Sequence, residues 1–327
     1  MLTMRHLRVV AALLFATWFT VAPASAQEPY PSKAITIIVP FGAGGALDLI
    51  ARVLADGLRT ELGQTVIIEN KPGGSGSLAM RAAAAAPPDG YTLMISSESN
   101  HILLPLLDPK VNLEVFKEFV PISLSGEFQH VLIVKKDMPV GNVRDLVEYL
   151  KSNPGKMSFG SSGVGTMAHI AGEFLSKETK AQMVHVPYRG SPAAMNDLLA
   201  GNLDINIQSM PALRSHIENP RLRILAVLSP QRLKDLPDTP TMAEIGFPDF
   251  VLSSWMGMFA PAALPADIRD KLSAAFVKIG QTPELQARIR QQGIEPVGSD
   301  AASFARYVEA EAKKWKAFVE RTGVKLQ

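Results

Sequence analysis

Short apolar, strand-like runs alternate with helical patterns along most of this 327-residue chain. This alternation constrains the fold strongly, because strands separated by helices tend to pair in parallel, with the helices covering the faces of the sheet. It predicts an α/β architecture with mostly parallel sheets. The predicted strands are residues 35–39, 65–69, 91–95, 131–135, 157–159, 183–186, 203–207 and 222–228.

Helix-start signals fall between these runs. Ser191-Pro192 and Thr282-Pro283 each read as an N-cap followed by proline at the first helical position, and Thr241 with Glu244 has the spacing of a capping box. The tail, residues 303–319, carries a stripe at helical spacing that is interpreted as core packing rather than a partner-binding face. The stripe consists of Phe304, Val308, Ala312, Trp315 and Val319.

The N-terminus indicates export. Arg5 and Arg8 precede an apolar run, residues 9–21, and Ala24-Ser25-Ala26 follows, so residues 1–26 are predicted to be a cleaved signal peptide. The apolar run is too short to span a bilayer as a stable helix. The chain has no cysteine, hence no disulfide and no lipid-attachment site, and a soluble protein of a Gram-negative periplasm is expected.

The size and charge of the chain further limit its domain organisation and its possible partners. About 300 residues remain after the signal peptide, which favours two domains. Cleavage removes two arginines and no acid, so the mature chain has as many basic as acidic residues, 31 of each. Neither a basic stripe nor arginines interleaved with aromatic residues suggests nucleic acid as a partner.

The first predicted strand runs directly into a glycine-rich turn, and a helix is expected from about Ala46. Such a turn presents free backbone N–H groups at a helix N-terminus, where an anion is stabilised. The candidate ligand-binding residues here are Phe41, Gly42, Ala43, Gly44, Gly45 and Asp48. Alternatively, Asp48 only complements the helix dipole.

Two further strand-to-helix junctions are candidates for the same site. In the segment 158–169, hydroxyl groups beside free N–H groups suit an anion or another acceptor. Its candidates are Ser161, Ser162, Gly165, Thr166 and His169, although His169 can equally be a packed structural residue. In the segment 186–191, Tyr188 is placed to cover a small ligand at a strand's carboxyl end, and Ser191 either caps a helix or contacts ligand.

Six motifs occur in one order: PFGAGG with Asp48, PGGSG, DGYTL, SSGVGT with His169, VPYRGS and PDTPTMAEIG. In that order the chain resembles the solute receptors of tripartite tricarboxylate transporters, the TctC or Bug family. The resemblance implies a two-lobed type II periplasmic-binding-protein fold, or Venus flytrap. Lobe 1 would comprise residues 27–126 and 253–327, and lobe 2 residues 127–252. It also implies a monomeric receptor that captures a small organic acid without a cofactor and delivers it to two membrane subunits.

The segment 96–105 both follows and departs from the family pattern. Ser97 and His101 fit it, whereas Glu98 and Leu104 do not, and Gln208 stands where relatives often carry aspartate. Glu98 either points to solvent, as glutamates usually do, or faces the cleft, where it would repel a second carboxylate or pair with a ligand amine.

Catalytic and metal-binding motifs were sought as well. The sequence contains no thiol nucleophile, no H-E-x-x-H and no G-x-S-x-G. His169 and Glu173 are four residues apart, but two candidate ligands do not make a metal site. A receptor without catalytic or metal residues is therefore expected. The alternatives are an enzyme of the same fold acting on a carboxylated substrate, and a ligand sensor that feeds a signalling partner.

Overall fold

A computed structural model describes residues 29–324. The predicted signal peptide, residues 1–26, lies outside the described residues. The chain divides into two units, Met1–Ser32 and Lys33–Gln327. The described helices and strands all belong to the second unit.

Each of the eight predicted strands corresponds to an observed strand, and the described residues contain two further strands. The strands are β1 Ile35–Val39, β2 Val66–Asn70, β3 Thr92–Ser97, β4 Phe119–Lys135, β5 Ser158–Ser161, β6 Val184–Pro187, β7 Ile205–Ser209, β8 Leu222–Val227, β9 Ser253–Pro261 and β10 Glu295–Pro296. They pair in the order β2-β1-β3-β9-β4-β7-β5-β6, and β8 and β10 also pair with β4.

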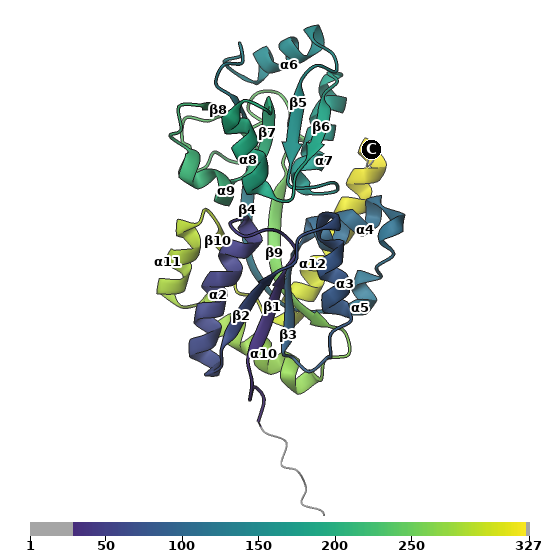
Figure 1. Cartoon of the computed structure of the whole chain (residues 1–327), viewed down its shortest axis with the longest axis vertical. Helices are drawn as coiled ribbons and strands as arrows, with labels where there is room; N and C mark the ends of the chain where they lie inside the picture. Colours follow the sequence, from purple (N-terminus) through teal and green to yellow (C-terminus); the bar gives the residue numbers. More distant parts are fainter. Residues whose placement is uncertain (1–28, 325–327) are drawn as a thin grey trace, which may run out of the picture. The chain divides into compact units, whose positions relative to one another are not determined.

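Strand β4 belongs to both halves of this sheet (Figure 1). Its residues up to Gln129 pair with β9 beside β3 and β1, and we call this part lobe 1. From His130 onward β4 pairs with β7 and β8 beside β5 and β6, and we call this part lobe 2. The α/β, two-lobed fold class is confirmed. The exact boundaries predicted between the lobes stay predictions.

The prediction of mostly parallel sheets needs correction. Among the described residues, β1 pairs in parallel with β2 and β3, and β5 does so with β6 and β7. The pairings that involve β4 or β9 are antiparallel. Both lobes are mixed because β4 runs from one lobe into the other and β9 runs beside it in the opposite direction.

Helices flank both lobes (Figure 1). Lobe 1 has α2 Ala46–Leu62, α3 Ser77–Ala84, α10 Ala266–Gly280, α11 Pro283–Gln291 and α12 Ala301–Thr322, with the short α4 Leu104–Leu107 and α5 Val115–Glu118. Lobe 2 has α6 Val143–Ser152, α7 Met167–Thr179, α8 Ser191–Ala200 and the short α9 Met210–Leu213. Single turns complete the fold: η1 Gly74–Gly76, the π-helical η2 Ser99–Leu103, η3 Pro109–Val111 and η4 Arg214–His216. Within residues 29–324, none of the helices is both long and apolar enough to cross a membrane.

The stripe on the C-terminal helix is part of the core, as predicted. Phe304, Val308 and Trp315 of α12 are buried in the main hydrophobic cluster and Ala312 packs against it, whereas Val319, the last residue of the stripe, is only half-buried and outside the cluster. This packing explains why the chain returns to lobe 1 at its end: burying a large aromatic or aliphatic side chain contributes roughly 1.5–3 kcal/mol.

The predicted caps differ in outcome. The backbone N–H of Thr241 donates to Glu244 and that of Glu244 to the Thr241 hydroxyl, at 2.8 and 3.1 Å, so the reciprocal bonds of the capping box form. A turn and not a helix follows, so the predicted helix start at this position is wrong. Thr282 does precede α11, but its hydroxyl donates to the Lys278 carbonyl instead of capping. The prediction that Ser191 caps α8 is wrong, because Gly190, at a φ of +123°, makes the turn and Ser191 is already helical.

Candidate functional site

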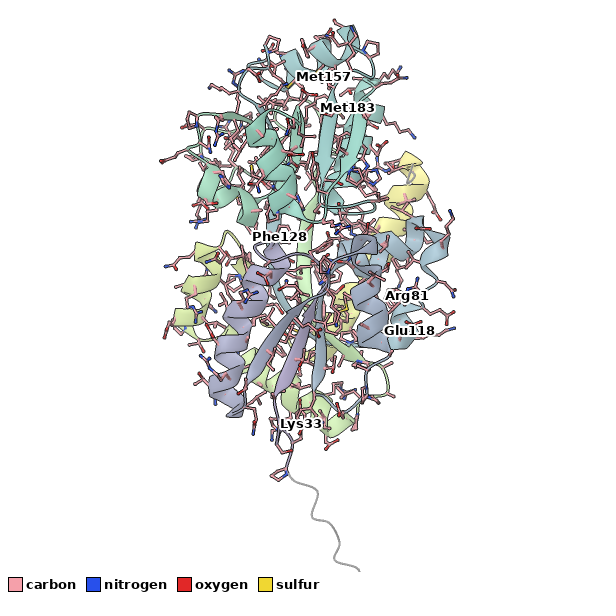
Figure 2. The ribbon with its side chains drawn as sticks, viewed as in Figure 1. Lys33, Arg81, Glu118, Phe128, Met157 and Met183 are labelled. Carbon is pink, nitrogen blue, oxygen red and sulfur yellow. The ribbon has the colours of Figure 1, made fainter. Side chains whose placement is uncertain are left out.

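A small cavity lies where the two lobes meet at β4. Its volume is about 50 Å³. Phe128, labelled in Figure 2, and His130 line it from β4, just before and just after the strand changes partners. Lobe 1 contributes Phe41, Gly45, Ala46, Leu47, Ser97, Glu98, Ser99 and Ser254, and lobe 2 contributes Ser162, Thr166, Met167, Ala168, Ser191 and Ser209.

Three helices begin at this cavity. Ala46 and Leu47 open α2, Met167 and Ala168 open α7, and Ser191 opens α8. The first N–H groups of a helix have no helical carbonyl partner, and the helix dipole makes this end positive. Three such ends around one cavity form a strong anion-binding arrangement. The hydroxyl of Ser162 at its wall adds a side-chain donor, whereas the Thr166 hydroxyl donates to the Gly163 carbonyl at 2.7 Å.

Asp48 holds the glycine loop in place beside the cavity. Its carboxylate accepts from the Gly44 N–H at 2.9 Å, from Arg52 at 2.9 and 3.0 Å and from the Asn70 amide at 3.0 Å. Asn70 also donates to the Phe41 carbonyl, which fixes the start of the loop. Burial acts to raise the pKa of Asp48, but the hydrogen bonds from Arg52, Gly44 and Asn70 outweigh it and lower the pKa.

Glu98 is fully buried and lines the cavity, so of the two alternatives the one in which it points to solvent is wrong. Its Oε1 accepts from the Ser254 and Ser99 hydroxyls at 2.6 and 3.1 Å, and its Oε2 accepts from the Trp255 N–H at 3.0 Å. Burial raises the pKa of Glu98 to about 7, although these hydrogen bonds act in the opposite direction. The carboxyl therefore exists in both protonation states near neutral pH.

A hydrogen bond joins the lobes at this network. The Met167 N–H, at the start of α7 in lobe 2, donates to the Ser99 hydroxyl of lobe 1 at 3.0 Å. Ser99 in turn donates to Glu98. One of the three helix starts is thereby connected to the buried carboxyl.

The two histidines predicted for the site are packed beside it. His101 stacks on Phe259 with ring centroids 3.8 Å apart, and His169 stacks on His185 at the same distance. The Gly165 N–H donates to His169 Nδ1 at 3.0 Å, and burial lowers the pKa of both His101 and His169 to about 3. His169 Nε2 lies 3.7 Å from Glu173. In the described part of the chain, no group of three histidine or acidic side chains is arranged to hold a metal ion.

The structure brings part of the predicted set together. Cavity-lining members are Phe41, Gly45, Ser97, Glu98, Ser162 and Thr166. The other predicted residues do not line it: Gly42, Ala43, Gly44, Asp48, His101, Ser161, Gly165, His169, Tyr188 and Gln208. Of these, Ala43 and Gly44 line a separate hollow beside α8, and His101 lines one beside α5. Direct ligand contact stays a prediction for all sixteen residues.

Two of them have partners that explain their placement. The Tyr188 phenol donates to Asp197 at 2.8 Å. The Gln208 amide donates to the Ser191 carbonyl and accepts from the Ser209 N–H, at 3.1 and 3.0 Å, so it ties β7 to the start of α8.

Sequence reasoning missed the lining that comes from the crossing strands: Phe128, His130, Ser209 and Ser254. The sequence signal that these residues share is weak. Each lies at or near the end of a strand or at the point where β4 changes partners, and only the pairing of distant segments reveals that position.

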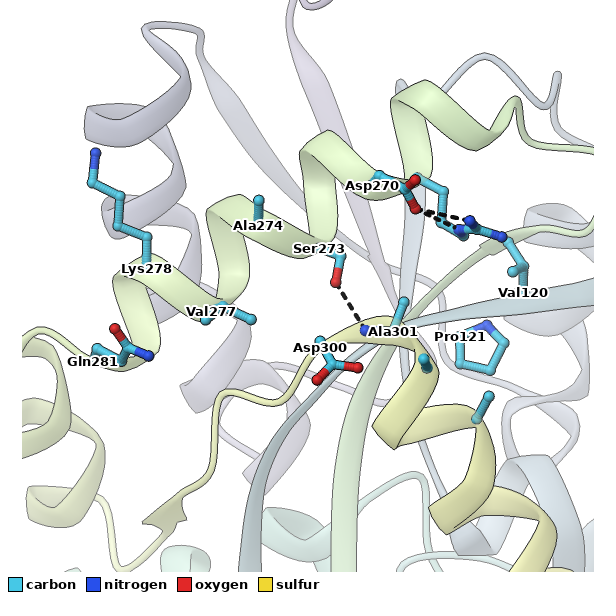
Figure 3. A pocket seen from close by; sticks show the side chains of 13 residues that line it. Val120, Pro121, Asp270, Ser273, Ala274, Val277, Lys278, Gln281, Asp300 and Ala301 are labelled. Atoms are coloured by element: carbon cyan, nitrogen blue, oxygen red, sulfur yellow. Dashed lines mark hydrogen bonds and ion pairs between the residues drawn. The ribbon is translucent and has the colours of Figure 1, made fainter.

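Larger hollows occur elsewhere on the molecule. One of about 600 Å³ lies between α10 and the start of α12 (Figure 3). Its polar groups serve the fold: the Ser273 hydroxyl accepts from the Ala301 N–H at 2.8 Å, and Asp300 caps α12 by accepting from the Ser303 N–H at 2.7 Å. The residues lining it differ from the predicted site residues. Another hollow of about 600 Å³ is lined by two of them, Ala43 and Gly44, whereas six of them line the small cavity together with the three helix starts, so we assign the site to the cavity between the lobes.

Comparison with known proteins agrees with this architecture. The family model described as tripartite tricarboxylate transporter family receptor, TctC, matches residues 50–324. Protein BugT of Bordetella pertussis is 35% identical over 327 residues, which is 100% of both chains. Among solved structures, Rhodopseudomonas palustris Rpa4515 with adipate is 30% identical with a TM-score of 0.86, covering 90% of this chain and 99% of that one. MatC from the same organism, with bound malate, is 27% identical with a TM-score of 0.84, covering 89% and 100%. The chain belongs to the TctC or Bug family of tripartite tricarboxylate transporter receptors.

Proposed function

We propose that this chain is a periplasmic receptor that captures a small organic acid in the cavity between its lobes. The observation that carries the proposal is the meeting of three helix N-termini, from α2, α7 and α8, at a cavity that both lobes line. This arrangement suits a carboxylate. Two structural relatives that hold adipate and malate support the same class of ligand.

Binding requires the lobes to separate. The cavity of about 50 Å³ is much smaller than typical small-molecule pockets, which have volumes of roughly 300–1,000 Å³. An organic acid with several carbon atoms needs more space. Strands β4 and β9, which run between the lobes, are the natural hinge, and contacts from both lobes would form together only on closure.

Replacing Ser99 by alanine is expected to weaken acid binding about fivefold. The substitution removes the hydrogen bond from the Met167 N–H, which joins the lobes, and a hydrogen bond contributes about 1 kcal/mol. Calorimetric titration measures the change. Ser176→Ala is a matched control. Ser176 lies on α7, the helix that begins at Met167, and its hydroxyl donates to the Ala181 carbonyl within lobe 2. Equal affinities of the two variants would contradict a role for the Ser99 bond in closure.

We propose further that the bound acid passes unchanged to the membrane subunits of a tripartite tricarboxylate transporter. Ser254 and His130 are 2.7 Å apart, a distance that also suits a nucleophile and its base. The Glu98 carboxyl, however, bonds to Ser254 and not to the second nitrogen of His130, so the histidine lacks the acid that orients it in a catalytic triad. Incubation of the purified protein with each ligand, followed by mass spectrometry, should recover the ligand intact, and conversion would overturn this proposal.

A thermal-shift screen of the mature chain, residues 27–327, tests the ligand class. The panel should contain mono-, di- and tricarboxylates, amino acids, aromatic acids and uncharged amides. A ligand at a hundred times its Kd stabilises the folded state by about 2.7 kcal/mol, which corresponds to a shift of several degrees. A shift confined to acids supports the proposal, whereas a shift only with uncharged amides would contradict the anion-binding role of the helix ends.

A further inference from the structure

Two polar atoms at the cavity have no hydrogen-bond partner among the described residues: Nδ1 of His130 and the hydroxyl of Ser209. Both side chains are 5% exposed. His130 of β4 and Ser209 of β7 are directly paired residues on neighbouring antiparallel strands, so their side chains lie on the same face of the sheet. An unsatisfied buried donor or acceptor costs about 1–3 kcal/mol, so this pair is well suited to meet a ligand group.

The other nitrogen of His130 is connected to Glu98. His130 Nε2 lies 2.7 Å from the Ser254 hydroxyl, and that hydroxyl lies 2.6 Å from Glu98 Oε1. A serine hydroxyl carries a single hydrogen, so it can donate to only one of these two neighbours at a time. The protonation state of Glu98 therefore decides the direction of both hydrogen bonds.

When Glu98 is ionised, Ser254 donates to the carboxylate and accepts from His130, so the proton of the neutral imidazole is on Nε2 and Nδ1 is an acceptor. When Glu98 is protonated, its hydroxyl donates to Ser254, Ser254 donates to Nε2, and the imidazole proton is on Nδ1. The change requires one proton. It enters at Nδ1, the Nε2 proton passes to Ser254, and the Ser254 proton passes to Glu98, so His130 is neutral before and after.

We propose that His130 and Ser209 form a polar subsite for the end of the ligand remote from its carboxylate, and that Glu98, acting through Ser254, sets whether His130 accepts or donates there. This inference rests on the proposed function, since it assumes an organic acid in the cavity. With Glu98 ionised, the subsite takes a hydroxyl or amide group, whose hydrogen meets Nδ1. A second carboxylate has no hydrogen for Nδ1, so it binds more weakly unless a proton enters with it.

The groups around Glu98 and His130 are compatible with both protonation states of Glu98. Burial raises the pKa of Glu98 to about 7 and lowers that of His130 to about 3, so the carboxyl titrates near neutral pH while the imidazole is uncharged. Titratable groups on the neighbouring elements have other partners. They are Asp48 with Arg52 on α2, His101 stacked on Phe259, His169 bonded by the Gly165 N–H, Asp197 on α8 bonded by Tyr188, and Tyr307 of α12, which donates to Glu127.

The tautomer of His130 can be observed without any ligand. Nitrogen-15 NMR of the histidine rings should show the proton of His130 on Nε2 at pH 8.5 and on Nδ1 at pH 5.5. Glu98→Gln keeps the size of the side chain and should remove the pH dependence, as should Ser254→Ala, which breaks the connection. His101 is buried in the same lobe outside this chain of bonds, and its signals should not change. One unchanging tautomer of His130 from pH 5.5 to 8.5 in the folded wild type would overturn the inference.

Paired ligands test the subsite itself. Succinate, glutarate and adipate are compared with their monoamides by calorimetry. At pH 8 the monoamide should bind about tenfold more tightly than its diacid, because Nδ1 of His130 then has no hydrogen for the second carboxylate and only the Ser209 hydroxyl can donate to it. The Kd of the diacid should rise about tenfold per pH unit above pH 7, since one proton accompanies binding, while that of the monoamide stays level.

The outcomes separate the two proposals. Diacids and monoamides that bind with the same affinity and the same pH dependence would overturn the subsite and leave the receptor function standing. If neither these compounds nor any other acid binds, the proposed function is wrong, and the ligand role of His130 and Ser209 is wrong with it.

Discussion

Alanine in place of Asp48 is expected to lower the free energy of unfolding by about 3 kcal/mol. The carboxylate is 2% exposed and accepts hydrogen bonds from Arg52, Asn70 and the Gly44 N–H. Losing a buried charged acceptor costs about 1–3 kcal/mol per partner left unsatisfied, with water replacing part of the loss at Arg52, whose side chain is 52% exposed. The glycine loop would loosen as well, so acid binding should weaken together with stability. Urea denaturation and calorimetry measure the two effects.

Asp56→Ala on the same helix is the matched control. Asp56 pairs with Arg59 and Arg288, but its side chain is 43% exposed. Exposed ion pairs contribute about 0–1 kcal/mol, so this variant should keep nearly all of its stability and its ligand affinity. If the two variants were destabilised equally, the role of Asp48 in holding the loop would be refuted.

Acid is expected to destabilise the protein well above the pH at which ordinary carboxylates titrate. Burial lowers the pKa of His101, His130 and His169 to about 3 and that of His185 to about 4. In the unfolded chain these groups have a pKa of about 6.5, so below pH 6.5 the unfolded state takes up protons that the folded state does not. Their contribution to stability is complete above pH 6.5 and is lost progressively as the pH falls toward the folded-state values.

The raised pKa of Glu98 acts in the opposite direction, because between about pH 7 and pH 4.5 the folded state binds one proton more than the unfolded state. Four histidines against one carboxyl leave a net difference of three protons. The unfolding free energy should therefore fall with decreasing pH by at most about 4 kcal/mol per unit. Urea titrations between pH 7.5 and 5 measure this slope, and His101→Phe should reduce it by about a third. A stability that stays level or rises on acidification would contradict the account.

The sequence patterns located much of the fold because the signals concerned are local. Each of the eight apolar runs lies largely within an observed strand, and the glycine turn before Ala46 opens α2 as expected. The apolar pattern did not predict β9 or the first part of β4. Serine, glycine and proline interrupt their patterns, yet β9 is buried along almost its whole length. Gly257 is one reason for the interruption: a Cβ there would lie 2.0 Å from the Phe304 ring, so the close packing of α12 on β9 requires glycine.

The candidate site likewise contains residues that local sequence patterns predict and residues that only long-range pairing brings in. Helix starts could be predicted from glycine, serine and threonine, since these residues favour turns and caps. His130, Ser209 and Ser254 reach the cavity through pairings of β4 with β7 and β9, which join segments far apart in the chain. The burial of Glu98 could not be read from its neighbours either. Glutamate is usually exposed, and the groups that make burial tolerable are donors from β9, namely the Ser254 hydroxyl and the Trp255 N–H.

Calorimetric titration of a cavity-blocking variant tests the central claim, that an organic acid binds among the three helix ends. Ala168 lines the cavity near the start of α7 and is 5% exposed, so Ala168→Glu places a competing carboxylate there. Ala310→Glu makes the same change of charge at an exposed position in the middle of α12, away from the three helix starts. The wild type and Ala310→Glu should bind the acid found in the screen with equal affinity, and Ala168→Glu should bind it at least a hundredfold more weakly, or about 2.7 kcal/mol. A folded Ala168→Glu protein that binds the acid as tightly as the wild type would show that the ligand binds elsewhere.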